Sequence, residues 1–179
     1  TDMNYIIDIL GGEVAVGHSY TSGGDFPDID NVSIGLLGAD FSIQNNSYRI
    51  DKIYTGESWN PDLNAPLARP GMDVAAGDYL VGVDGQELTA AENLFTAFEG
   101  KSGQQVRLHI NDSPTMEGAH VVIVEPIRSD RGLRTYDWIE GNRRKVDELS
   151  EGKIAYVYVP NTSGNGFNSF NRYYFAQQH

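Results

Sequence analysis

Short runs of alternating apolar and polar residues dominate the middle of the chain. In the clearest run, Val106, Leu108 and Ile110 are separated by charged or polar residues, so they fall on one face. Alternation with a period of two is typical of a half-buried β-strand. Strands are expected over residues 41–44, 48–54, 79–83, 105–110 and 121–124, and the last two of these show the alternation. We therefore expect one β-rich unit from residue 32 to about residue 126.

Helical spacing appears on both sides of this unit. Residues 3–16 suit a short helix, a break at Gly11-Gly12 and a second turn. Residues 136–150 carry an apolar stripe opposite charged residues, which predicts an amphipathic helix. Aromatic residues from Phe167 to Tyr174 are again spaced as one face of a helix.

The stretch from Asp62 to Leu88 is the most informative segment. Pro70-Gly71 forces a turn, and Gly77-Asp78 breaks the chain again before the predicted strand 79–83. Asp84-Gly85 then suits a two-residue type I′ hairpin, because glycine readily adopts positive φ. Each turn alone fits many small β-domains. Their order resembles the inner half of a PDZ domain, a module that binds the ends of extended peptides by adding them to its sheet.

A helix is predicted to start at Thr89 and run to Glu99. Thr89 and Glu92 have the spacing of a capping box, in which each side chain satisfies a backbone N–H group. Leu94 and Phe98 then lie on one apolar stripe. We expect part of this stripe to be core and one edge to form the wall of a peptide-binding groove, opposite the strand 41–44.

The loop before the first strand is the candidate carboxylate-binding site. In a PDZ domain, consecutive backbone N–H groups of this loop form an anion nest for the peptide terminus. The loop consists of Gly35, Leu36, Leu37, Gly38, Ala39, Asp40 and Phe41. Asp40 is unfavourable there, since its charge would oppose a carboxylate. Alternatively, the two glycines merely shape a turn.

Beyond the helix 136–150, the apolar run 153–159 predicts a buried strand that Pro160 ends. A strand, a loop and a helix in this order are typical of the beginning of an α/β unit, although the partner strand is missing. The predicted fold class is α+β, mainly β. It combines a PDZ-like, partly open barrel or sandwich with a short N-terminal helical segment and a C-terminal helix-strand-helix stub.

Composition narrows the function classes. The formal net charge is −12, from 13 basic and 25 acidic residues, so charge repulsion argues against nucleic acid and anionic membranes as partners. The sequence has no cysteine and no apolar run long enough to span a bilayer. Asp25, Asp28 and Asp30 are not spaced as a compact calcium loop. We expect no metal and no cofactor.

His18 is the one candidate for catalysis. It stands between a helical segment and a glycine-rich loop, which would leave its ring accessible. A lone histidine is more often a surface or hydrogen-bonded residue than a catalytic base. Ser19 is a poor nucleophile for it, because adjacent side chains seldom converge in the required geometry.

Taken together, these segments resemble the core of tricorn-type serine proteases, relatives of the C-terminal processing peptidases. GEVAVGHSYTSGGD is similar to the segment around the catalytic histidine, and DLNAPLARPG with GDYLVGVDGQEL is similar to the PDZ domain. Residues 133–170 resemble the entry into the catalytic α/β domain. The resemblance implies that His18 is a general base and that the serine, its glutamate and the oxyanion hole follow residue 179. Gly17 replaces the serine that commonly precedes this histidine, so Ser19 or a water takes that role, or the ring is less well held.

We accordingly expect an excised piece of a serine-type endopeptidase in four parts. Residues 1–31 carry the histidine, 32–126 are the PDZ domain, 127–151 are a linker helix, and 152–179 start the catalytic domain. The implied partners are a peptide or polypeptide substrate, the remaining domains and further copies of the parent. Cytoplasmic residence is implied, with export as the alternative. The piece alone should be inactive. The rival hypothesis is a non-catalytic PDZ adaptor.

Overall fold

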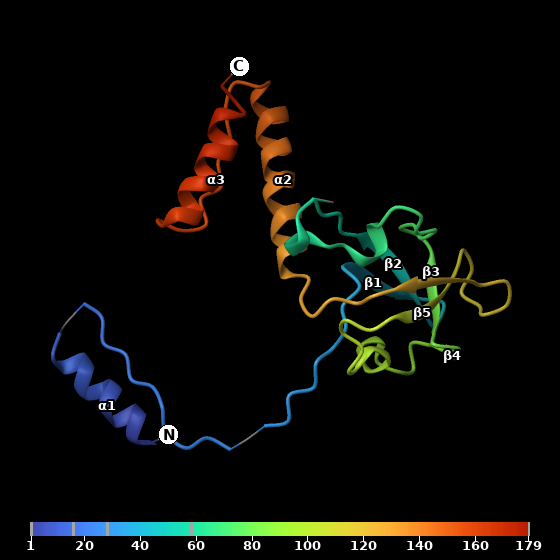
Figure 1. Ribbon diagram of the computed structural model, residues 1–179, viewed down its shortest axis with the longest axis horizontal. Coiled ribbons are helices and arrows are strands. Elements are labelled where there is room, and N and C mark those ends of the chain that lie inside the picture. The colour runs from blue at the N-terminus through green and yellow to red at the C-terminus, as the bar shows by residue number, and fades with distance from the viewer. Residues whose placement is uncertain (1, 16, 28, 58, 179) are drawn as a thin grey trace. The chain divides into compact units, whose positions relative to one another are not determined.

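The middle of the sequence forms an antiparallel sheet of six strands (Figure 1). The strand order is β1-β2-β3-β5-β6, and β4 pairs with β3 outside this path. The strands are β1 Ala39–Gln44, β2 Ser47–Ile53, β3 Tyr79–Val83, β4 Gln86–Glu87, β5 Val106–Asn111 and β6 His120–Val124. The five strands predicted between residues 41 and 124 are confirmed. Only the two-residue β4 was missed, because so short a segment has no periodicity.

The computed structural model describes residues 2–15, 17–27, 29–57 and 59–178. The chain divides into two compact units, residues 1–32 and 33–179. The smaller unit contains the helix α1, and the larger unit contains the sheet and every other helix. The α+β, PDZ-like fold class is confirmed.

Two tight hairpins set the register of the sheet. Asn45 and Asn46 have φ angles of 52° and 61° between β1 and β2, and Asp84 and Gly85 have 51° and 85° between β3 and β4. Positive φ at both central residues defines the type I′ turn, whose twist matches that of the flanking strands. The turn predicted at Asp84-Gly85 is confirmed.

The core lies on one face of the sheet. Leu80, Leu108 and Ile110 are fully buried. In β5, Arg107 is exposed between the buried Val106 and Leu108, as the alternation predicts. Phe98, 2% exposed, packs into the same cluster from a segment far along the chain. Burial of this apolar face provides most of the stabilisation of the sheet.

The segment predicted as a helix over 89–99 is different in the structure. Only a 3-10 helix forms, η3 Leu94–Phe98, and Asn93 caps it by accepting a hydrogen bond from the Phe95 N–H at 3.0 Å. The Tyr48 hydroxyl donates to the Glu92 carbonyl at 2.7 Å and accepts from the Leu94 N–H at 3.1 Å. These bonds to β2 occupy backbone groups that a longer helix would use. The predicted helix over 89–99, with its capping box at Thr89 and Glu92, is therefore wrong.

Two short 3-10 helices, η1 Pro61–Leu63 and η2 Pro66–Ala68, precede β3. The helix α1 spans Asp2–Glu13 without the predicted break at Gly11-Gly12. Glycine inside a helix costs about 1 kcal/mol relative to alanine but does not remove the backbone hydrogen bonds, so the helix continues.

The helix α2 spans Arg131–Ser150 and starts five residues earlier than the pattern indicated. Its first turn is joined to the β-domain by Leu133, which is 1% exposed and packs with Tyr54 and Ala65. Figure 1 shows α2 extending away from the sheet, with the last helix, α3 Gly164–Phe175, beside it. The helix predicted from the aromatic spacing is confirmed by α3.

The strand predicted over 153–159 is wrong. The segment has no strand pairing, because no neighbouring strand is available in the part of the chain that the structure describes. Instead, Gln177 beyond α3 accepts from the Tyr156 N–H at 3.2 Å and donates to the Tyr156 carbonyl at 2.9 Å. A continuous apolar run indicated burial, but a strand also needs a partner to satisfy its backbone.

The core assignment predicts that Leu108→Ala lowers the free energy of unfolding by about 2–5 kcal/mol, since it leaves a cavity in a fully buried site. Ile123→Ala on the outer face of β6, where the side chain is 53% exposed, should cost less than about 1 kcal/mol. Urea unfolding of the two variants measures both values. Equal losses would contradict the assignment of the buried face.

Candidate functional site

A groove of about 220 Å³ lies beside β1, at the edge of the sheet. The loop before β1 forms one wall, η3 forms the other, and α2 closes one end. It is lined by Gly35, Leu36, Leu37, Ala39, Phe41, Leu94, Phe95, Phe98, Asp130 and Arg134. The structure thus brings Leu94 and Phe98 together with five of the seven predicted loop residues, while Gly38 and Asp40 do not line the groove. We call this hollow the β1–η3 groove.

Some backbone N–H groups of the predicted carboxylate-binding loop, residues 35–41, are hydrogen-bonded within the protein, and others are free among the residues that the structure describes. The Gly35 N–H donates to the Phe98 carbonyl at 2.9 Å, and the Leu36 N–H donates to the Ile127 carbonyl at 2.7 Å. The N–H groups of Leu37 and Gly38 donate to no acceptor within the described residues. The number of free donors in this loop is therefore smaller than the sequence alone indicated.

Gly38 is required by both its conformation and its surroundings. Its φ angle is 68°, in the left-handed region that favours glycine, and a Cβ there would lie 3.0 Å from Cδ1 of Leu133. A side chain at position 38 would strain this backbone conformation and crowd Leu133. Both observations agree with the alternative that this glycine shapes a turn.

The mouth of the groove carries three charged side chains in direct contact. Arg134 donates from Nη1 to Asp40 Oδ1 at 2.7 Å and from Nε to Asp130 Oδ2 at 2.8 Å. The same Nη1 donates to the Tyr54 hydroxyl at 3.0 Å, and this hydroxyl donates to Asp40 Oδ2 at 2.8 Å. Asp40, the residue whose charge opposed a carboxylate, is therefore paired within the protein.

This network changes the proton affinity of its members. Partial burial acts to raise the pKa of Asp40, but hydrogen bonds from Arg134 and Tyr54 outweigh it and hold the pKa below its ordinary value. For Arg134, partial burial acts to lower the pKa, but hydrogen bonds to Asp40 and Asp130 raise it above its ordinary value. Both groups stay charged at neutral pH. The mouth then holds two negative charges and one positive charge.

His18 lies in the smaller unit, on an exposed stretch after α1. The Tyr20 hydroxyl is 3.1 Å from His18 Nδ1, and the two rings stack with centroids 6.0 Å apart. Ser19 is turned toward α1, since a Cβ on Gly11 would lie 2.6 Å from its Oγ. Among the neighbours of the ring, Tyr20 rather than Ser19 contacts it. The sequence analysis missed this residue.

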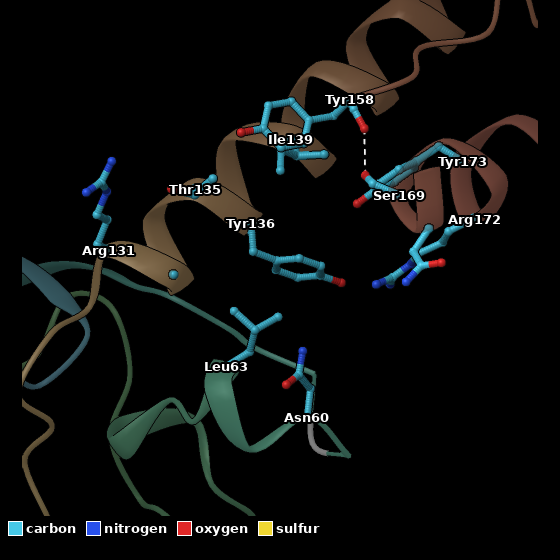
Figure 2. A pocket seen from close by; sticks show the side chains of 12 residues that line it. Asn60, Leu63, Arg131, Thr135, Tyr136, Ile139, Tyr158, Ser169, Arg172 and Tyr173 are labelled. Carbon is cyan, nitrogen blue, oxygen red and sulfur yellow. Dashed lines mark hydrogen bonds between the residues drawn. The ribbon is translucent and has the colours of Figure 1, made fainter. Parts of the chain in front are cut away.

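A second, larger hollow of about 560 Å³ lies between α2, α3 and η1. Figure 2 shows Tyr136 and Ile139 of α2 on one side and Ser169, Arg172 and Tyr173 of α3 on the other. The Ser169 hydroxyl donates to the Tyr158 carbonyl at 2.6 Å, which joins α3 to the segment before it. We call this space the interhelical hollow. None of the residues predicted for a site lines it.

The chemistry of the interhelical hollow depends on an ion pair and on the three tyrosines that line it, Tyr136, Tyr158 and Tyr173. Arg172 pairs with Glu57, whose side chain is only 8% exposed, and this bond raises the pKa of Arg172. Burial and the nearby charge of Glu140 raise the pKa of Tyr173 to about 12. Its hydroxyl stays neutral at physiological pH, so the hollow offers apolar rings and an internally compensated charge.

The described residues contain no cluster of three potential metal ligands and no helix long and apolar enough to cross a membrane. Val16, Asp28 and His179 lie outside the described residues.

The sequence analysis also missed Asp130 and Arg134 at the groove. Their i, i+4 spacing indicates a helical ion pair but not its contact with Asp40, which is 94 residues from Arg134 in sequence.

Comparisons with known proteins cover nearly the whole chain. The family model for the tricorn protease PDZ domain matches residues 35–129. A tricorn protease of Thermoplasma volcanium is 30% identical over 178 residues, 98% of this chain and 17% of the relative. A tricorn protease homolog of Saccharolobus solfataricus is 32% identical over 99% of this chain and 16% of the relative. The crystal structure of the tricorn protease matches 97% of this chain and 17% of its own, with a TM-score of 0.82 and 29% identity. The chain spans about a sixth of the length of these relatives.

The charge network predicts that Arg134→Met raises the pKa of Asp40 toward its ordinary value. A carboxylate with a lowered folded-state pKa stabilises the fold above about pH 4, and this contribution is lost as the pH falls through the folded-state pKa. In the variant, the acid loss of stability should therefore be shallower. A carboxyl-detected NMR titration of Asp40 measures the shift. Arg144→Met, an exposed site on the same helix, is the control, and identical Asp40 titrations in all three proteins would contradict the network.

Proposed function

Because this chain belongs to the family of the tricorn protease PDZ domain, we propose that it is part of a serine-type peptidase that hydrolyses peptides or polypeptides. The observation that carries the proposal is the extent of the similarity. Relatives named tricorn protease match 96–99% of the chain, including the segments before and after the PDZ domain. A free-standing PDZ adaptor, the rival hypothesis, gives no reason for similarity in these flanking segments.

In the proposed reaction, His18 acts as the general base. A serine hydroxyl attacks the peptide carbonyl while the imidazole takes its proton, and two backbone N–H groups stabilise the resulting oxyanion. The exposed position of the ring supports access for such partners. The Tyr20 hydroxyl beside Nδ1 leaves Nε2 as the nitrogen that faces the nucleophile. We assign the serine, its glutamate and the oxyanion hole to the parent protein beyond residue 179.

This division of the site predicts that the 179-residue chain by itself has no peptidase activity, because the proposed nucleophile and oxyanion hole lie outside it. Turnover of a fluorogenic peptide should equal that of buffer. In the full-length parent, His18→Ala should lower kcat about 10⁶-fold, as loss of a triad histidine does. His109→Ala, on the strand β5, is the matched control and should keep kcat. Hydrolysis by the short chain that His18→Ala abolishes would refute the division.

We assign the β1–η3 groove to binding of an extended peptide by strand addition. The support is geometric: β1 is an edge strand, its Ile43 is 60% exposed, and Phe95 on the opposite wall is 48% exposed. Leu94 and Phe98 are buried and form the floor. The ligand's backbone would pair with β1 while one apolar side chain enters the groove. The loop 35–41 would contribute the N–H groups of Leu37 and Gly38.

The groove assignment predicts that Phe95→Ala weakens peptide binding about three- to tenfold through loss of apolar contact, with little change in stability because the ring is half-exposed. Fluorescence anisotropy with labelled apolar peptides gives the affinity. Phe167→Ala removes an exposed ring of α3 and is the matched control. Equal affinities for both variants and the original chain would exclude this wall as a binding surface.

The domain boundaries stay a proposal: residues 1–31 as the histidine-bearing segment, 32–126 as the PDZ domain, 127–151 as a linker and 152–179 as the start of the catalytic domain. The proposed partners are the remaining domains and further copies of the parent. We place the parent in the cytoplasm, with an exported form as the alternative.

A further inference from the structure

We propose that the β1–η3 groove takes an apolar side chain from an internal, basic segment of polypeptide and discriminates against a free terminal carboxylate. This inference rests on the proposed peptide binding at the same groove. It reverses the ligand chemistry that the loop 35–41 indicated from sequence. The reason is the set of charges at the mouth of the groove.

Arg134 cannot serve as an uncompensated carboxylate receptor. Asp40 and Asp130 bind its guanidinium at 2.7 and 2.8 Å, and their side chains are 40% and 13% exposed. Of its five N–H donors, Nε and both donors of Nη1 are engaged, and Nη2 lies 3.4 Å from the Ala39 carbonyl. An arriving carboxylate would meet two existing carboxylates around one cation, and like charges at such an interface are unfavourable.

The loop itself offers little compensation. Two of its N–H groups are used within the protein, at Gly35 and Leu36, so only a short nest remains for an anion. A lysine or arginine on the ligand, by contrast, would find the negatively charged side chain of Asp40, which is 40% exposed. The chain's net charge of −12 adds a field that attracts basic segments and repels acidic ones.

The shape of the groove agrees with an internal segment. Its volume of about 220 Å³ is below the range of ordinary small-molecule sites and suits one side chain. Rings and aliphatic groups of Leu37, Phe41 and Phe98 line it. Strand addition along β1 requires no chain end, because the backbone pairing is the same for any extended residue.

Labelled synthetic peptides that share one leucine test the inference in titrations with the 179-residue chain. Three kinds of peptide are compared: one ends in a free carboxylate beside the leucine, one ends there in an amide, and one continues on both sides of the leucine. Each kind carries either lysine or glutamate next to the leucine. The amidated and internal lysine peptides should bind about tenfold more tightly than the free-carboxylate peptide. Added salt should narrow this gap, since the mouth is partly exposed.

Asp40→Asn removes one negative charge and should reduce the gap to about threefold or less. Asp73→Asn, whose side chain is 94% exposed and does not line the groove, is the matched control and should preserve the gap. Salt dependence in the original chain gives the same information if Asp40→Asn does not fold. Equal or tighter binding of the free-carboxylate peptide overturns the inference but leaves the groove assigned to peptide binding. A difference in affinity that neither salt nor Asp40→Asn alters has the same consequence. Absence of binding by every peptide overturns the groove assignment itself.

Discussion

The contact between the first turn of α2 and the loop before β1 determines the rest of the site. Leu133 is buried against Tyr54 and Ala65, and its two methyl carbons would lie only 3.0 and 3.1 Å from a Cβ at Gly38 or Gly56. A side chain at Gly38 would crowd Leu133, and one at Gly56 would clash first with the Leu63 carbonyl oxygen, 1.7 Å from the Cβ position. Because Arg134 follows Leu133 directly, this buried leucine also fixes the guanidinium at the mouth of the groove.

The charge network depends on that placement. A surface ion pair contributes little to stability, and Arg134 is 42% exposed, so its main effect is on the groove rather than on the fold. It brings Asp40 of the β-domain and Asp130 before α2 around one cation. The end of the groove is then acidic, while its walls are apolar. In the proposed site, the PDZ-like fold would position the peptide backbone, and α2, which begins after the matched residues 35–129, would determine which ligand charge is accepted.

The sequence predicted what depends on local rules. The strand 105–110 followed from alternation, and the Asp84-Gly85 turn followed from the tolerance of glycine for positive φ. The helix at 89–99 failed because Tyr48, more than 40 residues away, binds the backbone at Glu92 and Leu94. The strand at 153–159 failed because pairing needs a second strand that local sequence does not supply.

The candidate site divides in the same way. The loop 35–41 and the apolar stripe at Leu94 and Phe98 were identified from sequence, since glycine spacing and helical periodicity are local signals. Asp130 and Arg134 were missed, because their contact with β1 depends on how α2 packs. Tyr20 was missed because a hydroxyl two residues from a histidine is common, and only the folded backbone brings it beside Nδ1.

Amide chemical-shift mapping with an amidated, lysine-flanked apolar peptide tests the central claim most directly. The account predicts the largest shifts at Leu37, Gly38, Phe41 and Phe95, along the edge of β1. It predicts no comparable shifts at Tyr136 and Tyr173 in the interhelical hollow. Shifts confined to that hollow, or to the opposite sheet edge at β6, would contradict it.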